Sequence, residues 1–339
     1  MYHSVRNIQD ETKFNFTRNF IKLGYKIVDL EFSYLTTMEM KDWSDLFQSL
    51  SKQHSELTRL TIANCKISDS CLYDIFSEKN VNTFQQLKYL DLQGNLISQS
   101  AAFTISQPFV TQLNYLNISM NVNIGDEGIH EFVKSGVLNN LQSFILQRTQ
   151  CTAQGVKSVT LLNQLTHLDL SKNSIQAEGI SNLVQNITLC QNLKVLKLCH
   201  CGLRVAGMNT LISAEVHFKN LRHLDLEWNR LEEEGIQTLC SSSLLKQVTY
   251  LNLKLNGVND RAAQCIAHSP HLQQLTALNL AQNHISHVGA LALLTSTTLR
   301  PTLRMLNLNL NNVHDEHLKK TLQQEPNYEI LKTGLNLLE

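Results

Sequence analysis

The chain of 339 residues repeats one short pattern along most of its length. The segment LKYLDLQGNLI begins at Leu87, and it has near-copies that begin at Leu57, Leu113, Leu141, Leu165, Leu193, Leu221, Val248, Leu275 and Leu303. The starting points are mostly 26 to 28 residues apart, with extremes of 24 and 30, and a weaker copy begins at Ile27. One unit of this length cannot bury its own apolar face, so the pattern predicts an elongated stack of units that share a core.

Each copy predicts a strand followed by a helix. Apolar residues at the fourth and sixth positions alternate with polar ones, as a short half-buried strand requires. The second half has the helical period, and in EEEGIQTLCSSSLL the residues Ile236, Leu239 and Cys240 share one helical face. The sequence therefore predicts an α/β solenoid. Parallel strands pack about 4.8 Å apart and helices about 8 to 10 Å apart, so we expect a horseshoe with a concave sheet and convex helices.

The ninth position of the repeat predicts a structural ladder of amide side chains. A buried amide can bond the backbone groups that are left open where each strand turns away. Asparagine occupies this position at Asn95, Asn121, Asn173, Asn229, Asn256, Asn283 and Asn311. Cys65, Thr149 and Cys201 fill the same position in three other copies.

These residues resemble the ribonuclease-inhibitor-type class of leucine-rich repeats. The resemblance covers roughly residues 27 to 330, and it includes a glycine six residues beyond the ninth position at Gly155, Gly179, Gly207, Gly235 and Gly289. It implies a binding scaffold without catalytic activity. The repeats of this chain are similar in length, whereas ribonuclease inhibitor itself strictly alternates two types of repeat. This difference argues against inhibition of a ribonuclease. Richness in Asn and Gln, with only 13 Gly and 4 Pro, resembles leucine-rich-repeat effectors of intracellular bacterial pathogens such as Legionella.

The third, fifth, seventh and eighth positions are expected to point into the hollow of the horseshoe, because side chains alternate along a strand. We predict that they bind a partner protein, whose identity the residues do not name. The predicted contacts are Tyr89, Asp91, Tyr115, Arg148, His167, Asp169, Lys197, His223, Asp225, Glu227, Trp228, Tyr250 and Lys254. Beyond them the surface becomes smaller and uncharged, from Ala277 to Asn309.

One block of these residues combines large aromatic side chains with charge. His223, Asp225, Glu227 and Trp228 are followed on the next strand by Tyr250 and Lys254. Interface hot spots favour this mixture, so we expect Trp228 and Tyr250 to contribute most to partner binding. The alternative is that exposed aromatic residues on a strand merely pair with their neighbours across the sheet.

Composition and spacing argue against several other classes of function. Basic and acidic residues both number 29, so the chain lacks the basic surface of a nucleic-acid-binding protein. Cys199, His200 and Cys201 suggest a metal site, but no second cysteine pair at zinc-ribbon spacing accompanies them. We expect no metal and no cofactor. A catalytic Cys–His pair is disfavoured because Cys71, Cys190, Cys240 and Cys265 fall in helical halves, where buried cysteines act as small apolar residues.

Three segments are expected along the chain. Residues 1–56 form an N-terminal cap that includes the degenerate first repeat, residues 57–325 form the array of about ten repeats, and residues 326–339 form a C-terminal cap. In the first cap, Phe16, Phe20 and Leu23 are expected to form one apolar helical face that ends at Gly24 and covers the open core. The alternative is a short helix for partner binding or targeting. Pro326 is expected to break the last helix before a final strand.

The start of the chain lacks the features of a secretory signal peptide, and no apolar run is long enough to span a bilayer. We therefore expect an intracellular monomer with reduced thiols, located in the host-cell cytoplasm if it is a secreted effector. One enzymatic alternative is a solenoid similar to the GTPase-activating protein for Ran, in which Arg59 or Arg148 would approach a nucleotide. The chain has no acidic C-terminal tail like that of this family.

Overall fold

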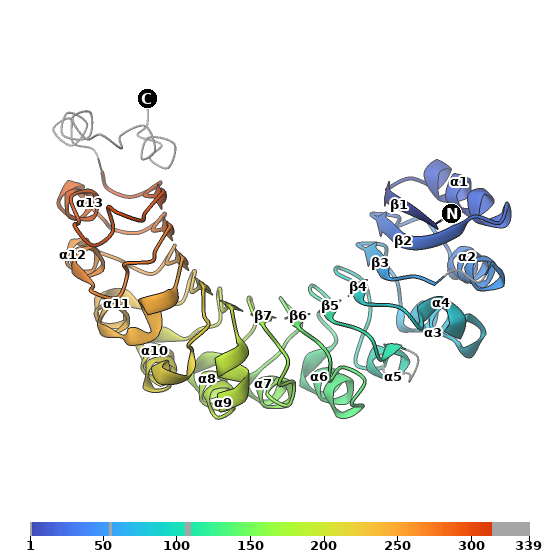
Figure 1. Cartoon of the computed structure of the whole chain (residues 1–339), viewed down its shortest axis with the longest axis horizontal. Helices are drawn as coiled ribbons and strands as arrows, with labels where there is room; N and C mark the ends of the chain where they lie inside the picture. Colours follow the sequence, from blue (N-terminus) through green and yellow to red (C-terminus); the bar gives the residue numbers. More distant parts are fainter. Residues whose placement is uncertain (1, 54–55, 106–109, 314–339) are drawn as a thin grey trace. The chain divides into compact units, whose positions relative to one another are not determined.

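The computed structural model describes residues 2–53, 56–105 and 110–313. The chain divides into two units, Met1–Leu168 and Asp169–Glu339. In each unit short parallel strands alternate with helices, and the strands lie in the order of the chain (Figure 1). The predicted α/β class with a parallel sheet is therefore confirmed.

The first unit begins with the longest strands. Its strands are β1 (Tyr2–Ile8), β2 (Lys26–Ser33), β3 (Arg59–Ala63), β4 (Tyr89–Asp91), β5 (Tyr115–Asn117) and β6 (Ser143–Ile145), and β7 (His167–Asp169) crosses the division between the units. Its helices are α1 (Glu11–Lys22), α2 (Met40–Lys52), α3 (Asp69–Ile75), α4 (Val81–Phe84), α5 (Ala101–Ile105), α6 (Gly125–Lys134) and α7 (Ala153–Val159), with a 3-10 turn, η1, at Glu78–Asn80.

The second unit repeats the same order of elements. Its strands are β8 (Val195–Lys197), β9 (His223–Asp225), β10 (Tyr250–Asn252), β11 (Ala277–Asn279) and β12 (Met305–Asn307). Its helices are α8 (Gln176–Val184), α9 (Ile187–Asn192), α10 (Arg204–Ser213), α11 (Glu232–Ser241), α12 (Asp260–His268) and α13 (His287–Leu294), with 3-10 turns η3 (Glu215–His217) and η4 (Ser243–Gln247).

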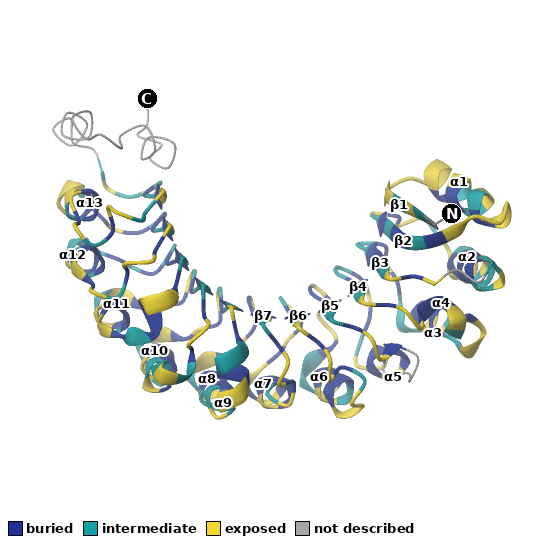
Figure 2. Cartoon of the chain, viewed as in Figure 1, coloured by how far each residue is buried: buried dark blue, intermediate teal, exposed yellow. Residues whose placement is uncertain are grey.

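The strands lie where the repeat predicts them, because each of the ten clear copies contains one at its third to fifth positions. The residue at the fourth position points into the core between strands and helices, and neighbouring strands align it in register. Leu90 pairs with Leu116 in the first unit, Leu224 pairs with Leu251 in the second, and all four side chains are buried. Figure 2 shows this buried layer between the strands and the helices of each unit.

The predicted ladder at the ninth position is also confirmed. Asn229 shows the pattern: its Nδ2 atom donates to the carbonyl groups of Leu198 at 2.7 Å and Leu226 at 2.9 Å, and its Oδ1 atom accepts from the backbone N–H of Cys201 at 3.1 Å. Cys201 takes the equivalent place in its own repeat, with its Sγ atom 3.2 Å from the carbonyl oxygen of Leu170. Asn229 and Cys201 thus each bond their own repeat and the preceding one.

The N-terminal segment differs from the prediction. Helix α1 buries Phe14, Thr17 and Ile21, whereas Phe16 is 69% exposed and Leu23 is 77% exposed. The expected apolar face of Phe16, Phe20 and Leu23 is therefore wrong as the covering face. The helix carries apolar residues on two sides, and the side with Phe14 packs closely against Phe32 and Trp43. Helical periodicity by itself cannot tell which of two apolar faces meets the core.

Strand β1, which precedes this helix, was not expected from the sequence. It pairs with β2 in parallel, and the register shifts twice along the pair. Arg6 on β1 forms an ion pair with the buried carboxylate of Asp29 on β2. The segment before the first repeat therefore extends the sheet by one strand. The predicted C-terminal cap at residues 326–339 lies outside the described residues.

Candidate functional site

In both units, one side of the sheet carries the predicted contact positions and the other faces the helices. We call the first side the open face; it bears the third, fifth, seventh and eighth positions of each repeat. Strand β9 is typical, with Leu224 buried and both His223 and Asp225 half-buried. Alternation along each strand thus places the predicted contacts together on this face, in rows that run across neighbouring strands.

In the first unit, the third positions form a cation–aromatic stack. The guanidinium carbon of Arg59 lies 3.4 Å from the ring centroid of Tyr89. The rings of Tyr89 and Tyr115 stack with centroids 4.0 Å apart and planes 7° from parallel. The three residues lie in register on β3, β4 and β5, so strand pairing itself holds the stack together. Arg59 is thereby engaged within the chain.

The fifth positions beside this stack form a polar row. Asp91 accepts a hydrogen bond from the backbone N–H of Gln93 at 3.0 Å, and Asn117 donates to the other carboxylate oxygen of Asp91 at 3.1 Å. Burial raises the pKa of Asp91 above its ordinary value, and the hydrogen bonds from Gln93 and Asn117 oppose this rise. Burial also raises the pKa values of Tyr89 and Tyr115, so both phenols are neutral at physiological pH.

Two other predicted contacts of the first unit stand apart from this cluster. Arg148 is exposed and has a left-handed backbone, with φ of 55°. His167 is exposed, and its Nδ1 atom lies 2.8 Å from the hydroxyl oxygen of Thr166. Arg148 follows strand β6 and His167 begins strand β7, whereas Tyr89, Asp91 and Tyr115 lie on β4 and β5.

In the second unit, an aromatic pair occupies the third positions. The rings of His223 and Tyr250 stack with centroids 4.0 Å apart and planes 8° from parallel. The two residues are register partners on β9 and β10. Burial and the nearby carboxylates of Asp225 and Glu227 raise the pKa of Tyr250. The stack leaves both rings only half-buried, so they present a flat surface on the open face.

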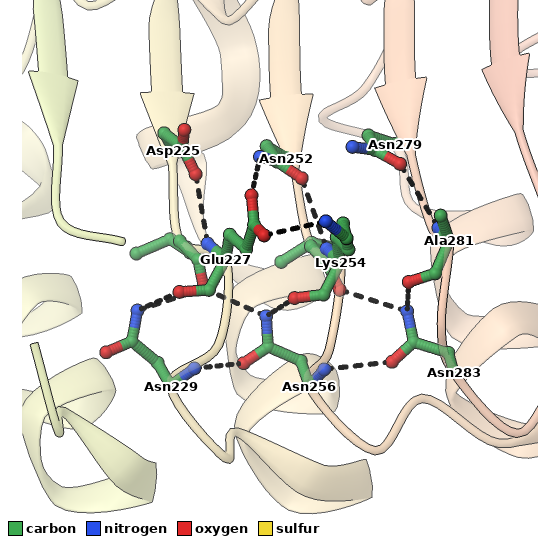
Figure 3. A network of polar contacts seen from close by, with 11 residues as sticks. Asp225, Glu227, Asn229, Asn252, Lys254, Asn256, Asn279, Ala281 and Asn283 are labelled. Carbon is green, nitrogen blue, oxygen red and sulfur yellow. Dashed lines mark hydrogen bonds and ion pairs between the residues drawn. The ribbon is translucent and has the colours of Figure 1, made fainter. Parts of the chain in front are cut away.

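A polar network lies beside this pair, and Figure 3 shows it. The Glu227 carboxylate accepts from Nζ of Lys254 at 3.0 Å and from Nδ2 of Asn252 at 3.1 Å. Asp225 accepts from the backbone N–H of Glu227 at 3.0 Å. Burial raises the pKa of Asp225, although hydrogen bonds from Glu227 and Asn252 act in the opposite direction. The charged side chains of this block are therefore held in place by contacts within the chain.

Trp228 belongs to a different row, at the eighth position of its repeat. Its ring contacts that of His200 on the preceding repeat, with centroids 4.1 Å apart, and the side chain is 46% exposed. Trp228 and His200 both have left-handed backbones, with φ of 55° and 53°. The other nine eighth positions share this conformation, namely Tyr34, Asn64, Gly94, Met120, Arg148, Lys172, Leu255, Gln282 and Leu310. The recurring turn, which the sequence analysis missed, aims this row outward where each strand ends.

Asp169 and Lys197, the remaining predicted contacts, lie at the fifth positions of β7 and β8. The Lys197 amine is 3.9 Å from a carboxylate oxygen of Asp169. Asp169 is buried, and its other oxygen accepts from the backbone N–H of Ser171 at 2.9 Å. The carboxylate therefore has a structural role in addition to the binding role that we predict for it.

This structural role recurs as a second ladder, which the sequence analysis also missed. At the fifth position, the side-chain oxygen of Asp or Asn accepts from the backbone N–H two residues later. The acceptors are Asp91, Asn117, Asp169, Asp225, Asn252, Asn279 and Asn307. Such side chains favour this local bond, so the recurrence of Asp or Asn at one position was the available signal.

The cysteines are buried or half-buried, and all eight are free thiols. Burial raises the pKa of Cys71 and Cys190 to about 12 each. Burial, together with the carboxylates of Glu227 and Asp225, raises the pKa of Cys199 to about 12. A thiol with such a pKa is protonated at neutral pH and is a poor nucleophile.

The structure separates the side chains of the candidate metal site at Cys199, His200 and Cys201. Over residues 2–53, 56–105 and 110–313, no group of three or more His, Cys, Asp or Glu side chains could hold a metal ion. Cys201 points into the ladder, where its Sγ atom contacts backbone oxygens, while Cys199 and His200 lie on the open face.

None of the helices in the described ranges is long and apolar enough to cross a membrane.

Sequence comparison finds the family described as Leucine Rich repeat in five segments of the chain. These are residues 111–132, 163–184, 219–240, 247–267 and 271–294. Each segment contains one strand and all or most of the helix that follows it. No curated protein matches the chain in a sequence comparison.

Solved structures provide the comparison of fold. A chain from the crystal structure of the yeast Rad7 and Elc1 complex is 16% identical, with a TM-score of 0.56, and the match covers 89% of this chain and 81% of that one. A chain of the mouse RP105/MD-1 complex is 18% identical over 80% of this chain and 41% of that one, with a TM-score of 0.46. An internalin from Listeria monocytogenes is 15% identical over 96% and 94% of the two chains, with a TM-score of 0.44. The first likeness supports the leucine-rich-repeat fold.

Proposed function

We propose that this chain, which has a leucine-rich-repeat fold, is a non-catalytic scaffold that binds a partner protein on the open face of its sheet. The observation that carries this proposal is the pairing of aromatic side chains on that face. His223 supports Tyr250, and His200 supports Trp228. Aromatic side chains that are already ordered lose little conformational entropy on binding, which favours their use as anchors.

The charge of the open face supports a protein partner. Acidic and basic side chains pair with one another, as Glu227 does with Lys254 and Asp169 does with Lys197. Nucleic acid would require unpaired basic side chains in a continuous stripe. The aromatic residues beside these pairs are of the kind enriched in protein interfaces.

We also infer the finer class and the biological setting from the sequence pattern. Repeats of 26 to 28 residues with Asn or Cys at the ninth position support the ribonuclease-inhibitor-type class. Richness in Asn and Gln supports a bacterial effector that acts on a host protein. We further propose the domain limits given above, with the cap at residues 1–56 and the array at residues 57–325.

The proposal is tested by affinity capture from a host-cell lysate, followed by mass spectrometry. The bait variants are Tyr250→Ala and Trp228→Ala, and the control is Tyr73→Ala, which changes an exposed tyrosine on helix α3 rather than on the sheet. We expect at least one protein that is captured by the wild type and the control but lost from both sheet variants. Capture that is identical for all four proteins would contradict the proposal.

An activity assay separates this scaffold from the enzymatic alternative. The purified chain is added to a panel of small GTPases loaded with GTP, and the rate of GTP hydrolysis is measured. We expect an unchanged rate with every member of the panel. Acceleration that depends on Arg148 or Arg59 would instead assign the chain to the GTPase-activating class.

A further inference from the structure

A hollow of about 410 Å³ opens on the open face over the last three described strands. It lies beyond the charged block, where the surface residues become small and uncharged. Its lining residues are Tyr250, Ala277, Leu278, Asn279, Met305, Leu306, Asn307 and Asn309. None of these except Tyr250 is among the contacts predicted from the sequence.

The hollow exists because Ala277 separates two larger side chains. Tyr250, Ala277 and Met305 are register partners on β10, β11 and β12. One face of the Tyr250 ring stacks on His223, and the other lies on the side of Ala277. Tyr250 and Met305 are thus two strand spacings apart, or about 9 to 10 Å. That distance accommodates one planar group, since stacked rings in this chain lie 4.0 Å apart.

The polar side of the hollow offers two hydrogen-bond donors. Oδ1 of Asn279 accepts from the backbone of Ala281, and Oδ1 of Asn307 accepts from the backbone of Asn309. Their Nδ2 atoms have no acceptor in the described part of the chain, and in Figure 3 only the oxygen of Asn279 carries a contact.

Equivalent amides elsewhere do have acceptors. Nδ2 of Asn117 donates to Asp91 and Gln93, and Nδ2 of Asn252 donates to Glu227. At Asn279 and Asn307 the seventh position of the preceding strand is Lys254 or Ala281, whose side chains carry no acceptor. The two donors are therefore available to an incoming group.

We propose that this hollow is the socket for an aromatic side chain of the partner protein, and that an acidic residue beside this side chain accepts hydrogen bonds from Asn279 and Asn307. The inference rests on the proposed function and names the chemistry that the partner must present. The aromatic ring enters between Tyr250 and Met305, above Ala277. An arginine guanidinium has the right thickness but no acceptor, so it would leave both amide donors unpaired.

Small probes test the socket without the partner. The full chain is labelled with ¹³C at its methionine methyl groups, and the Met305 signal is assigned from the Met305→Leu variant. The probes are phenylacetate, benzylamine and cyclohexylacetate, which vary the charge and the planarity separately. We expect phenylacetate to shift the Met305 signal and to bind about tenfold more tightly than benzylamine, because a carboxylate satisfies the amide donors. We expect cyclohexylacetate, which is too thick for the slot, to bind more weakly than phenylacetate.

Two kinds of variant test whether phenylacetate binds in the hollow. Ala277→Phe fills the hollow and should abolish the shift of the Met305 signal that phenylacetate causes. Asn279→Asp and Asn307→Asp keep the oxygen that closes the local turn, as Asp225 does at the same position, but they replace the donor with an acceptor. Each should weaken phenylacetate binding about tenfold and leave the thermal unfolding temperature nearly unchanged.

The outcomes separate this proposal from the proposed function. The socket assignment is overturned if phenylacetate leaves Met305 unshifted, if benzylamine or cyclohexylacetate binds as tightly, or if Ala277→Phe retains the shift. In that case, capture of a partner that depends on Tyr250 and Trp228 would still support the scaffold. Conversely, a specific shift with phenylacetate would stand even if lysate capture failed.

Discussion

The ring of Tyr250 lies flat against the ring of His223, with centroids 4.0 Å apart and planes 8° from parallel. The pair shows how this protein orders the open face of its sheet on strands of only three residues. Parallel pairing brings the same repeat position into register on every strand, so one stacked neighbour is enough to fix the orientation of a large side chain.

Truncation of the aromatic anchors should weaken partner binding. Tyr250→Ala and Trp228→Ala are each expected to reduce affinity by about 2 kcal/mol, or roughly 30-fold, because each removes an ordered aromatic surface. The measurement is calorimetric titration of the captured partner, with circular dichroism to verify the fold. Affinities within about twofold of wild type for both variants would favour the alternative that these aromatic residues only pair across the sheet.

The asparagine ladder should contribute strongly to stability. Asn229→Ala removes bonds to the carbonyl groups of Leu198 and Leu226 and to the N–H of Cys201. Because these groups are buried, we expect a loss of about 2 to 4 kcal/mol in the free energy of unfolding. Asn229→Cys should lose about half as much, since Cys201 occupies the same position natively.

Urea denaturation of the two ladder variants checks this order. The control is Asn123→Ala, which changes an exposed asparagine outside the ladder. The interpretation fails if Asn229→Ala and Asn123→Ala unfold at the same urea concentration.

The recurring glycines should differ in how well they tolerate a methyl group. A Cβ at Gly155 would lie 2.4 Å from a carboxylate oxygen of Asp126 and 2.8 Å from Sγ of Cys151. At Gly235 the nearest atom would be Cβ of Leu231, at 3.1 Å. We expect Gly155→Ala to cost about 1 to 3 kcal/mol of stability by overpacking, and Gly235→Ala to cost less. Thermal unfolding of both variants measures the difference, and equal transition temperatures would refute it.

Glu215 should make stability depend on pH in the acidic range. Its Oε2 atom accepts from Ser242 Oγ at 2.5 Å and from the backbone N–H of Ser243 at 2.7 Å, and the hydrogen bond from Ser242 lowers the pKa of Glu215. A carboxyl group with a lowered pKa stabilises the fold above its unfolded pKa of about 4.3, and that contribution is lost as the pH falls through the folded value.

Glu215→Gln should therefore unfold at a lower temperature than wild type at pH 7, and the two proteins should converge as the pH falls below about 4. Thermal unfolding from pH 7 to pH 3 tests this expectation. A difference in transition temperature that stays constant over the whole range would show that the charge of Glu215 is not involved.

The repeat pattern determined the strands, the helices and the ladder, because these features depend on spacing within one unit and on a requirement that every unit shares. Leu90 and Leu224 are buried for the same reason, and Asn95 and Asn229 bond the backbone in the same way. Because the same spacing of residues recurs in ten copies, the prediction did not depend on any one residue.

Only the tertiary structure decided which residues meet across the repeats. The sequence grouped Trp228 with Tyr250 and Lys254, but in the fold Tyr250 stacks on His223, Lys254 pairs with Glu227, and Trp228 contacts His200 of the preceding repeat instead. It also decided that α1 packs through Phe14 and that a hollow lies over Ala277. These contacts depend on the sizes of side chains on neighbouring strands and helices. The periodicity within a single repeat does not predict them.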